Sequence, residues 1–221
     1  MKEDGEGMKM IRMIKRENGI TIIELLVALV IFAVVIAGTY RLFISQSRAY
    51  TVQDQVVETQ QSIRSAMEIL LRDLRMTGFD NDSLNSKITI LTPMIAENND
   101  VTINYEFDDT TQYSVSYWRD ALTQSMRRQL TTIRDDGSSV AGPIEVLLEN
   151  VEELKFTYGV DIDDDKALDN WVEAGAINGA RVVAVRIRLT ARPQQLTAED
   201  QKMMSPRTLE SAVTLRNLCM R

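Results

Sequence analysis

The sequence contains no histidine and one cysteine, Cys219, among 221 residues. Without histidine, Ser-His-Asp and Cys-His catalysis, His-ligated zinc and most haem ligation are excluded. A single cysteine forms neither an internal disulfide nor a cysteine-based zinc site, and we expect a free or packed thiol or an intermolecular disulfide. Basic side chains are also scarce, with 25 Lys and Arg against 32 Asp and Glu. The resulting net charge of −7 argues against a broad nucleic-acid-binding face.

The remaining composition is that of a folded protein, with 44% hydrophobic and 26% charged residues. The length suits one ordinary domain plus an appendage. The sequence contains no nucleophile–base pair and no phosphate-binding loop. We therefore expect no enzymatic activity, no small-molecule substrate and no cofactor apart from the calcium alternative considered below.

One long apolar segment dominates the hydropathy pattern. Residues 25–37 are thirteen consecutive apolar residues, and the segment extends back to Ile20 with only Thr21 and Glu24 as polar members. As a helix, these 18 residues span about 27 Å, which is just enough to cross a bilayer core. Basic residues precede the segment, so the positive-inside rule predicts a cytoplasmic N-terminus and an exported C-terminal part. These basic residues are Lys9, Arg12, Lys15 and Arg16.

Three interpretations of this segment compete. It is an uncleaved signal anchor, a signal peptide cut after Ala37, or a helix whose precursor is cut between Gly19 and Ile20. Inserting a charged carboxylate into the membrane as part of a helix costs about 3 kcal/mol of free energy. We therefore expect such a carboxylate to have a partner or to stay hydrated at the interface. The first two interpretations leave Glu24 without a partner.

Residues 15–29 resemble the leader and first helix of type IV prepilins and type II secretion pseudopilins. The shared pattern is a basic leader ending in Gly, an apolar residue, a hydroxyl residue, and then Glu inside an apolar helix. The resemblance implies cleavage by prepilin peptidase between Gly19 and Ile20 and N-methylation of Ile20, where most relatives have Phe or Met. It also implies that Thr21 and Glu24 act in assembly, with Glu24 pairing with the N-terminal ammonium of a neighbouring subunit.

A second apolar pattern extends the helix beyond the membrane segment. Its members recur at steps of four and three residues, which predicts one buried stripe. The stripe consists of Val56, Gln60, Ile63, Met67, Leu70 and Leu74, with Gln60 as its single polar interruption. We expect it to pack on a globular domain, with a short coiled coil as the alternative. Gly78 marks the helix end. The predicted parts are a leader (1–19), a helix (20–76, with 20–40 as the transmembrane and assembly part) and a β-rich domain (77–221).

Alternation with a period of two predicts strands in the C-terminal part. Turn residues separate several of them, at 108–111 and 135–137. The expected strands are 87–91, 101–107, 113–117, 126–133, 154–158, 183–189 and 208–215. The predicted fold class is therefore α+β and pilin-like, with a long N-terminal helix packed on a C-terminal antiparallel sheet domain.

Four further segments are similar to PilW-like minor pilins, and the first of them also to J-type pseudopilins. These segments are 72–79, 149–158, 183–192 and 213–217. The resemblance implies a minor pilin that initiates assembly of a type IV pilus and stays near its tip. Its partners would be prepilin peptidase, other minor pilins, a major pilin or pseudopilins, and the inner membrane, with the C-terminal domain periplasmic before export to the pilus.

Two alternatives remain open. In the first, the chain is a J-type pseudopilin of a type II secretion system. In the second, it is a membrane-anchored exported binding module with no filament role.

An acidic loop is the one candidate metal site in the sequence. Asp161, Asp163 and Asp165 are spaced like the first ligands of a calcium loop, but the sixth and twelfth positions hold Lys166 and Val172 instead of Gly and Glu. The loop is therefore not an EF-hand. A looser Ca²⁺ site with these three aspartates as ligands is the alternative to a solvated acidic loop.

Overall fold

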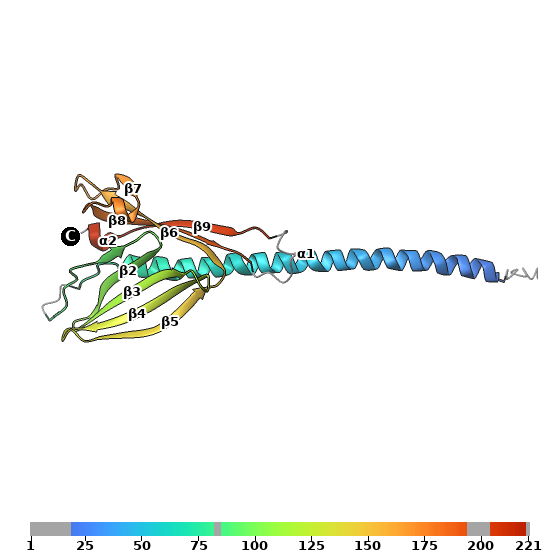
Figure 1. Ribbon diagram of the computed structural model, residues 1–221, viewed down its shortest axis with the longest axis horizontal. Helices are drawn as coiled ribbons and strands as arrows, with labels where there is room; N and C mark the ends of the chain where they lie inside the picture. Colours follow the sequence, from blue (N-terminus) through green and yellow to red (C-terminus); the bar gives the residue numbers. More distant parts are fainter. Residues whose placement is uncertain (1–18, 82–84, 194–203, 220–221) are drawn as a thin grey trace, which may run out of the picture. The chain divides into compact units, whose positions relative to one another are not determined.

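The computed structural model describes residues 19–81, 85–193 and 204–219. The chain divides into two units, one up to Ala49 and one from Tyr50 onward. Helix α1 (Ile22–Met76) contributes to both units (Figure 1). Its first part has every described side chain exposed, whereas its second part, from Tyr50 to Met76, packs in the globular unit.

The predicted stripe is the buried face of α1 in the globular unit. Ile63, Met67, Leu70 and Leu74 are buried, while Val56 is half-buried and Gln60 is exposed at the start of the contact. The expected packing on a globular domain is thus confirmed.

A five-stranded antiparallel sheet lies on one side of this part of α1 (Figure 1). It is a meander in which each strand pairs with the next one along the chain, so short turns suffice. The hairpin of the second and third strands aligns Ile103 with Val115. The strands are β1 (Met94–Ala96), β2 (Asp100–Asp108), β3 (Thr111–Asp120), β4 (Ser125–Arg134) and β5 (Ser139–Leu148).

A four-stranded antiparallel sheet lies on the other side of α1, in the order β7-β6-β8-β9 (Figure 1). The long central pair aligns Phe156 with Ile187. Its elements are β6 (Val151–Asp161), β7 (Asn170–Val172), β8 (Arg181–Ala191) and β9 (Arg207–Thr214). A 3₁₀ turn, η1 (Ala174–Ala176), precedes β8, and the short helix α2 (Arg216–Cys219) follows β9.

The two sheets and the helix share one hydrophobic core. In strands such as β2 and the first part of β6, alternate residues point inward, so a period of two in the sequence corresponds to a buried face. The helix contributes Ile63, Ala66, Met67, Leu70 and Leu74. The first sheet contributes chiefly Val101, Ile103, Val115, Tyr117 and Met126. The second contributes chiefly Leu154, Phe156, Tyr158, Val185, Ile187 and Leu189.

The end of α1 is fixed by contacts from distant parts of the chain. Gly78 has φ of 69° and donates its N–H to the carbonyl of Asn104 over 2.9 Å, so the expected glycine terminus is confirmed. The side-chain amide of Asn217 donates to the carbonyls of Arg75 and Thr77, each over 3.2 Å. These bonds satisfy carbonyls that a helix end leaves without intrahelical partners.

The α+β class and most predicted strands are confirmed, with three differences. The expected strand at 87–91 is wrong, because this segment uses its backbone in loop contacts such as Lys87 N–H to Asp109 O over 2.8 Å. Strands β1, β5 and β7 were not expected from the sequence. The antiparallel domain also consists of two sheets rather than one.

Candidate functional site

Thr21 caps the N-terminus of α1. Its Oγ1 accepts a hydrogen bond from the backbone N–H of Glu24 over 3.3 Å, and its carbonyl accepts from Leu25 N–H over 3.1 Å. A hydroxyl residue at this position satisfies one of the donors that a helix start leaves free. Gly19 and Ile20 lie just before the helix and are exposed. A cut between them would therefore leave a new N-terminus beside the first helical turn.

Glu24 is exposed in the first turn of α1, three residues after the capping Thr21. Thr-x-x-Glu is the spacing of a capping box, and a carboxylate in the first turn interacts favourably with the helix dipole. Glu24 therefore occupies a position that favours the helix start, and the resemblance implies a separate intersubunit role. An experiment on Glu24 has to separate the two.

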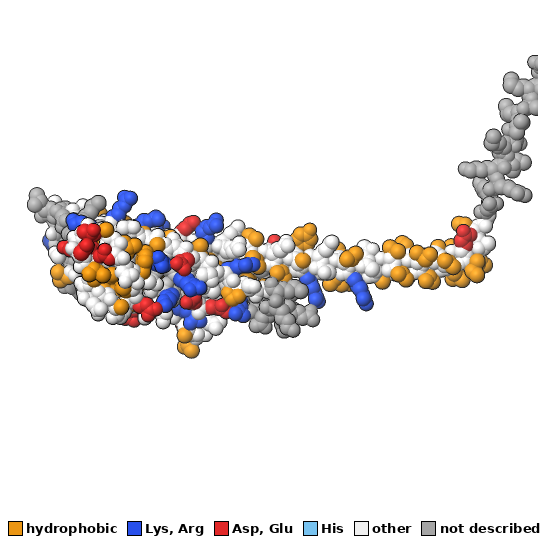
Figure 2. Space-filling view, turned by 90° about the horizontal axis from the view of Figure 1, so that it is seen from above, with side chains coloured by type: hydrophobic (Ala, Val, Ile, Leu, Met, Phe, Trp, Pro, Cys, Tyr) orange, Lys and Arg blue, Asp and Glu red, His pale blue; other side chains and the backbone are white. Residues whose placement is uncertain are grey.

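The first part of α1 presents an apolar surface that no residue in the described part of the chain covers. Figure 2 shows hydrophobic side chains along it, and the bulky ones from Ile20 to Ile44 are 37–81% exposed. Soluble monomers rarely expose an apolar surface of this extent. The helix is long and apolar enough to cross a membrane by length and composition. The 21 residues from Ile20 to Tyr40 would span about 31 Å, close to the thickness of a bilayer core.

A buried polar cluster fixes the second part of α1 to the first sheet. Asp73 Oδ2 accepts from the Tyr117 hydroxyl over 2.6 Å and from Arg128 Nε and Nη2 over 3.0 and 2.9 Å. Arg128 Nη1 also donates to Glu145 over 3.1 Å. Burial, together with the hydrogen bond to Asp73, raises the pKa of the Tyr117 hydroxyl above its usual value near 10. The cluster sets where α1 sits on strands β3 and β4.

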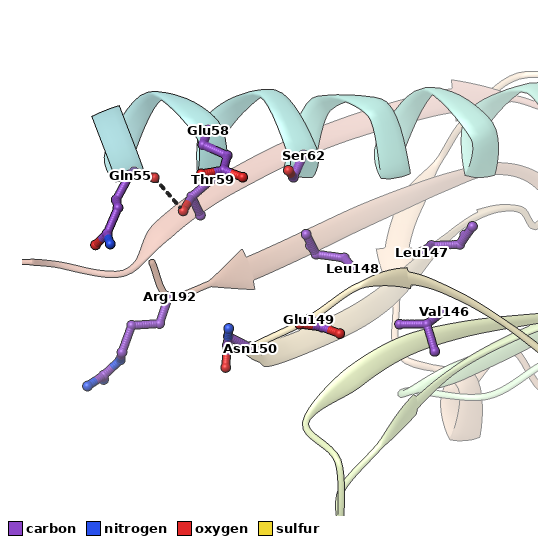
Figure 3. A pocket seen from close by; sticks show the side chains of 10 residues that line it. All are labelled: Gln55, Glu58, Thr59, Ser62, Val146, Leu147, Leu148, Glu149, Asn150 and Arg192. Atoms are coloured by element: carbon purple, nitrogen blue, oxygen red, sulfur yellow. Dashed lines mark hydrogen bonds between the residues drawn. The ribbon is translucent and has the colours of Figure 1, made fainter. Parts of the chain in front are cut away.

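A polar groove lies between α1, the β5–β6 turn and the end of β8 (Figure 3). Its volume is about 330 Å³. Gln55, Glu58, Thr59 and Ser62 line it from the helix, and Arg192 lines it from the opposite side. Its lining combines the Glu58 carboxylate, the Thr59 and Ser62 hydroxyls and the Arg192 guanidinium, so the groove is polar and carries both charge signs.

The acidic loop follows β6 and ends at β7. Carboxylate oxygens of Asp161, Asp163 and Asp169 lie within 4.8 Å of one another. Asp165 is not part of this group, and its Oδ1 accepts from Ala167 N–H over 2.7 Å in a local turn. The structure thus brings together two of the three aspartates suggested by spacing, and it adds one that spacing did not suggest.

Two family models match the sequence. The model described as "Prokaryotic N-terminal methylation motif" matches residues 14–40, which contain the Gly19–Glu24 pattern. The model described as "Type IV Pilus-assembly protein W" matches residues 112–217, which run from β3 to α2. The two matches cover the segment of the capped helix start and most of the two sheets.

Comparison with solved structures gives a distant match. A type IV-like pilin from Thermus thermophilus aligns with a TM-score of 0.48 and 12% identity, covering 72% of this chain and 97% of that one. No curated protein matches the sequence.

Proposed function

The chain belongs to the type IV pilin superfamily as a PilW-like minor pilin, and from this premise we propose that it initiates assembly of a type IV pilus and stays near the tip. Prepilin peptidase cuts the precursor between Gly19 and Ile20, and Ile20 becomes the methylated N-terminus. The observation that carries the proposal is the position of the methylation motif at the start of a helix whose apolar first part is exposed.

The exposed helix requires two environments in turn. Before assembly, its apolar side chains lie in the inner membrane, with the C-terminal domain on the periplasmic side. During assembly, the helices of neighbouring pilins replace lipid around the same side chains, so the apolar surface stays out of water throughout. The globular unit, held to the second part of α1 by the shared core, is carried along with the helix.

Glu24 supplies the specific contact of assembly. The new α-ammonium of a neighbouring subunit and the Glu24 carboxylate are each costly alone in an apolar environment, and together they attract strongly. Because the pair forms only between subunits, it sets the register of each incoming chain.

Glu24→Gln tests this role. Gln still fits the Thr-x-x-Glu/Gln capping box, so it keeps the helix start and removes only the charge. In cells that lack the chromosomal copy and carry prepilin peptidase, we expect equal amounts of wild type and variant in the membrane. We expect the variant in the sheared filament fraction to fall at least ~10-fold, because breaking a buried ion pair costs well over the 1.4 kcal/mol that a tenfold change needs.

Glu68→Gln is the matched control, since Glu68 is an exposed carboxylate on the same helix. The control should enter filaments and restore filament number as the wild type does. If Glu24→Gln enters filaments equally well, Glu24 serves only as a capping residue and the proposed contact is wrong.

A further inference from the structure

The acidic loop carries a carboxylate cluster that the filament function does not use. Asp161 is the last residue of β6, and Asp163 and Asp169 lie in the loop that leads to β7. Their nearest oxygens are within 4.8 Å of one another. Calcium binds oxygen at about 2.4 Å, so two ligands on opposite sides of one ion are about 5 Å apart. The spacing of the three carboxylates therefore accommodates a single Ca²⁺ between them.

Asp161 is the residue that points to a ligand. It is only 3% exposed, and its Oδ2 accepts from Lys166 N–H over 2.9 Å. Its Oδ1 is buried and has no hydrogen-bond partner. Burying a carboxylate oxygen without a partner is costly, and a cation at the cluster would supply the missing interaction.

The basic side chains nearby do not neutralise the cluster. Within the described residues, no ion pair joins Asp161, Asp163 or Asp169 to a Lys or Arg. Arg181 lies opposite Asp161 in the β6–β8 register, but its Nη2 pairs with Asp164 over 2.8 Å. Its Nη1 is buried and has no partner. An ion pair between Arg181 and Asp161, formed by a shift of the Arg181 side chain, is therefore the alternative to a bound metal.

We propose that Asp161, Asp163 and Asp169 bind one Ca²⁺ ion. Three carboxylates are hard oxygen donors, which suit Ca²⁺ or Mg²⁺ rather than zinc or copper. Two of the three are exposed in a loop, and such a site takes its remaining ligands from water. Calcium tolerates this irregular coordination, whereas Mg²⁺ requires near-ideal octahedral geometry. We expect an affinity typical of extracellular modules, with Kd of about 0.1–1 mM.

Two titrations of the full processed chain in uncharged detergent test the site. Isothermal titration with CaCl₂ should give one site per chain. Tb³⁺, which replaces Ca²⁺ at oxygen sites, should emit when Trp171 is excited, because Trp171 follows Asp169 by two residues, and added Ca²⁺ should quench this emission. Trp171→Phe should remove the emission and leave the calorimetric Ca²⁺ binding unchanged.

Four substitutions locate the ligands. Asp161→Asn, Asp163→Asn and Asp169→Asn should each weaken Ca²⁺ binding at least ~10-fold, because each removes a charged ligand. Asp165→Asn is the matched control, since it makes the same charge change in the same loop while Asn still accepts the Ala167 N–H. It should bind Ca²⁺ within about twofold of the wild type. Asp163 is exposed, so its variant should fold with an unchanged circular dichroism spectrum and melting temperature in chelator.

Two results would overturn the proposal. If wild type binds Ca²⁺ no more tightly than Asp163→Asn, then Arg181 rather than a metal compensates Asp161. If Asp165→Asn weakens binding as much as Asp163→Asn does, the loop attracts cations only through its overall charge.

Discussion

Replacing Asp73 by Asn should destabilise the globular unit strongly. Asp73 is 5% exposed, and its Oδ2 accepts three hydrogen bonds from Tyr117 and Arg128. Without the carboxylate, Arg128, whose side chain is 15% exposed, keeps only Glu145 as an ionic partner, and that side chain is 53% exposed. Solvent screens such a pair, so the guanidinium stays largely uncompensated, at a cost of about 3 kcal/mol.

Urea unfolding of the full chain in detergent measures this cost. The fluorescence of Trp118, next to Tyr117 in β3, reports on the region. For a domain of this size, about 3 kcal/mol corresponds to a fall in Tm of ~6–12 °C. The matched control is again Glu68→Gln, an exposed carboxylate on the same helix, which should shift stability by less than about 0.5 kcal/mol.

A double variant tests whether the loss arises from the orphaned charge. In Asp73→Leu/Arg128→Met both charges are gone and apolar groups fill the space. Its destabilisation should be at least ~1 kcal/mol smaller than the sum of the two single variants. An Asp73→Asn variant as stable as the Glu68→Gln control would refute the reasoning, as would strictly additive single variants.

The remaining predictions concern the buried tyrosines and the leader. Burial raises the pKa of Tyr117 and of Tyr158 above 10 in the folded state. Above about pH 10, the two hydroxyls therefore lose their protons in the unfolded state while they keep them in the folded state. The free energy of unfolding then falls by about 1.4 kcal/mol per pH unit for each tyrosine. Denaturation at a series of alkaline pH values should show a shallower decline for Tyr117→Phe, and an unchanged slope would contradict this. Gly19→Val should retain the leader by mass spectrometry while Gly38→Val is processed normally, since an added Cβ meets no atom within 4 Å at either glycine. Normal processing of Gly19→Val would remove Gly19 from the proposed cleavage site.

Local patterns were sufficient for the elements whose signal lies in neighbouring residues. The uninterrupted apolar run and the stripe that follows it predicted α1, and Gly78 predicted its end. The clean alternation of Val183 to Leu189 predicted β8, which the structure has at Arg181–Ala191. The stripe and the alternation work as signals because the second part of α1 and strand β8 each bury one face in the core.

Strand β5 was missed for a local reason. It contains Gly142 and Pro143, which strands generally avoid. Both fit here because β5 is an edge strand, where Pro needs no partner for its nitrogen. A Cβ on residue 142 would lie 2.9 Å from the carbonyl oxygen of Leu130, so this close approach of two backbones requires Gly.

The polar clusters were missed because their signals are not local. Asp73 looks like an exposed residue beside Leu74 until β4 brings Arg128, 55 residues later in the chain, against it. Asp169 joins Asp161 because the loop folds back, with Ile162 N–H donating to Asp169 Oδ2 over 2.6 Å. A carboxylate ligand supplied by loop closure leaves no fixed spacing in the sequence.

The N-terminus of the protein recovered from cells that carry prepilin peptidase tests the central claim most directly. Intact mass and N-terminal sequencing identify the first residue and any methyl group on it. A chain that begins at N-methylated Ile20 is the predicted result, because only this cut places a free ammonium at the start of the helix that carries Glu24. A chain that begins at Gly38 would contradict the account, because the cut would remove Glu24. A chain that keeps residues 1–19 would also contradict it, because Glu24 would then lack its proposed ammonium partner at the start of a neighbouring helix.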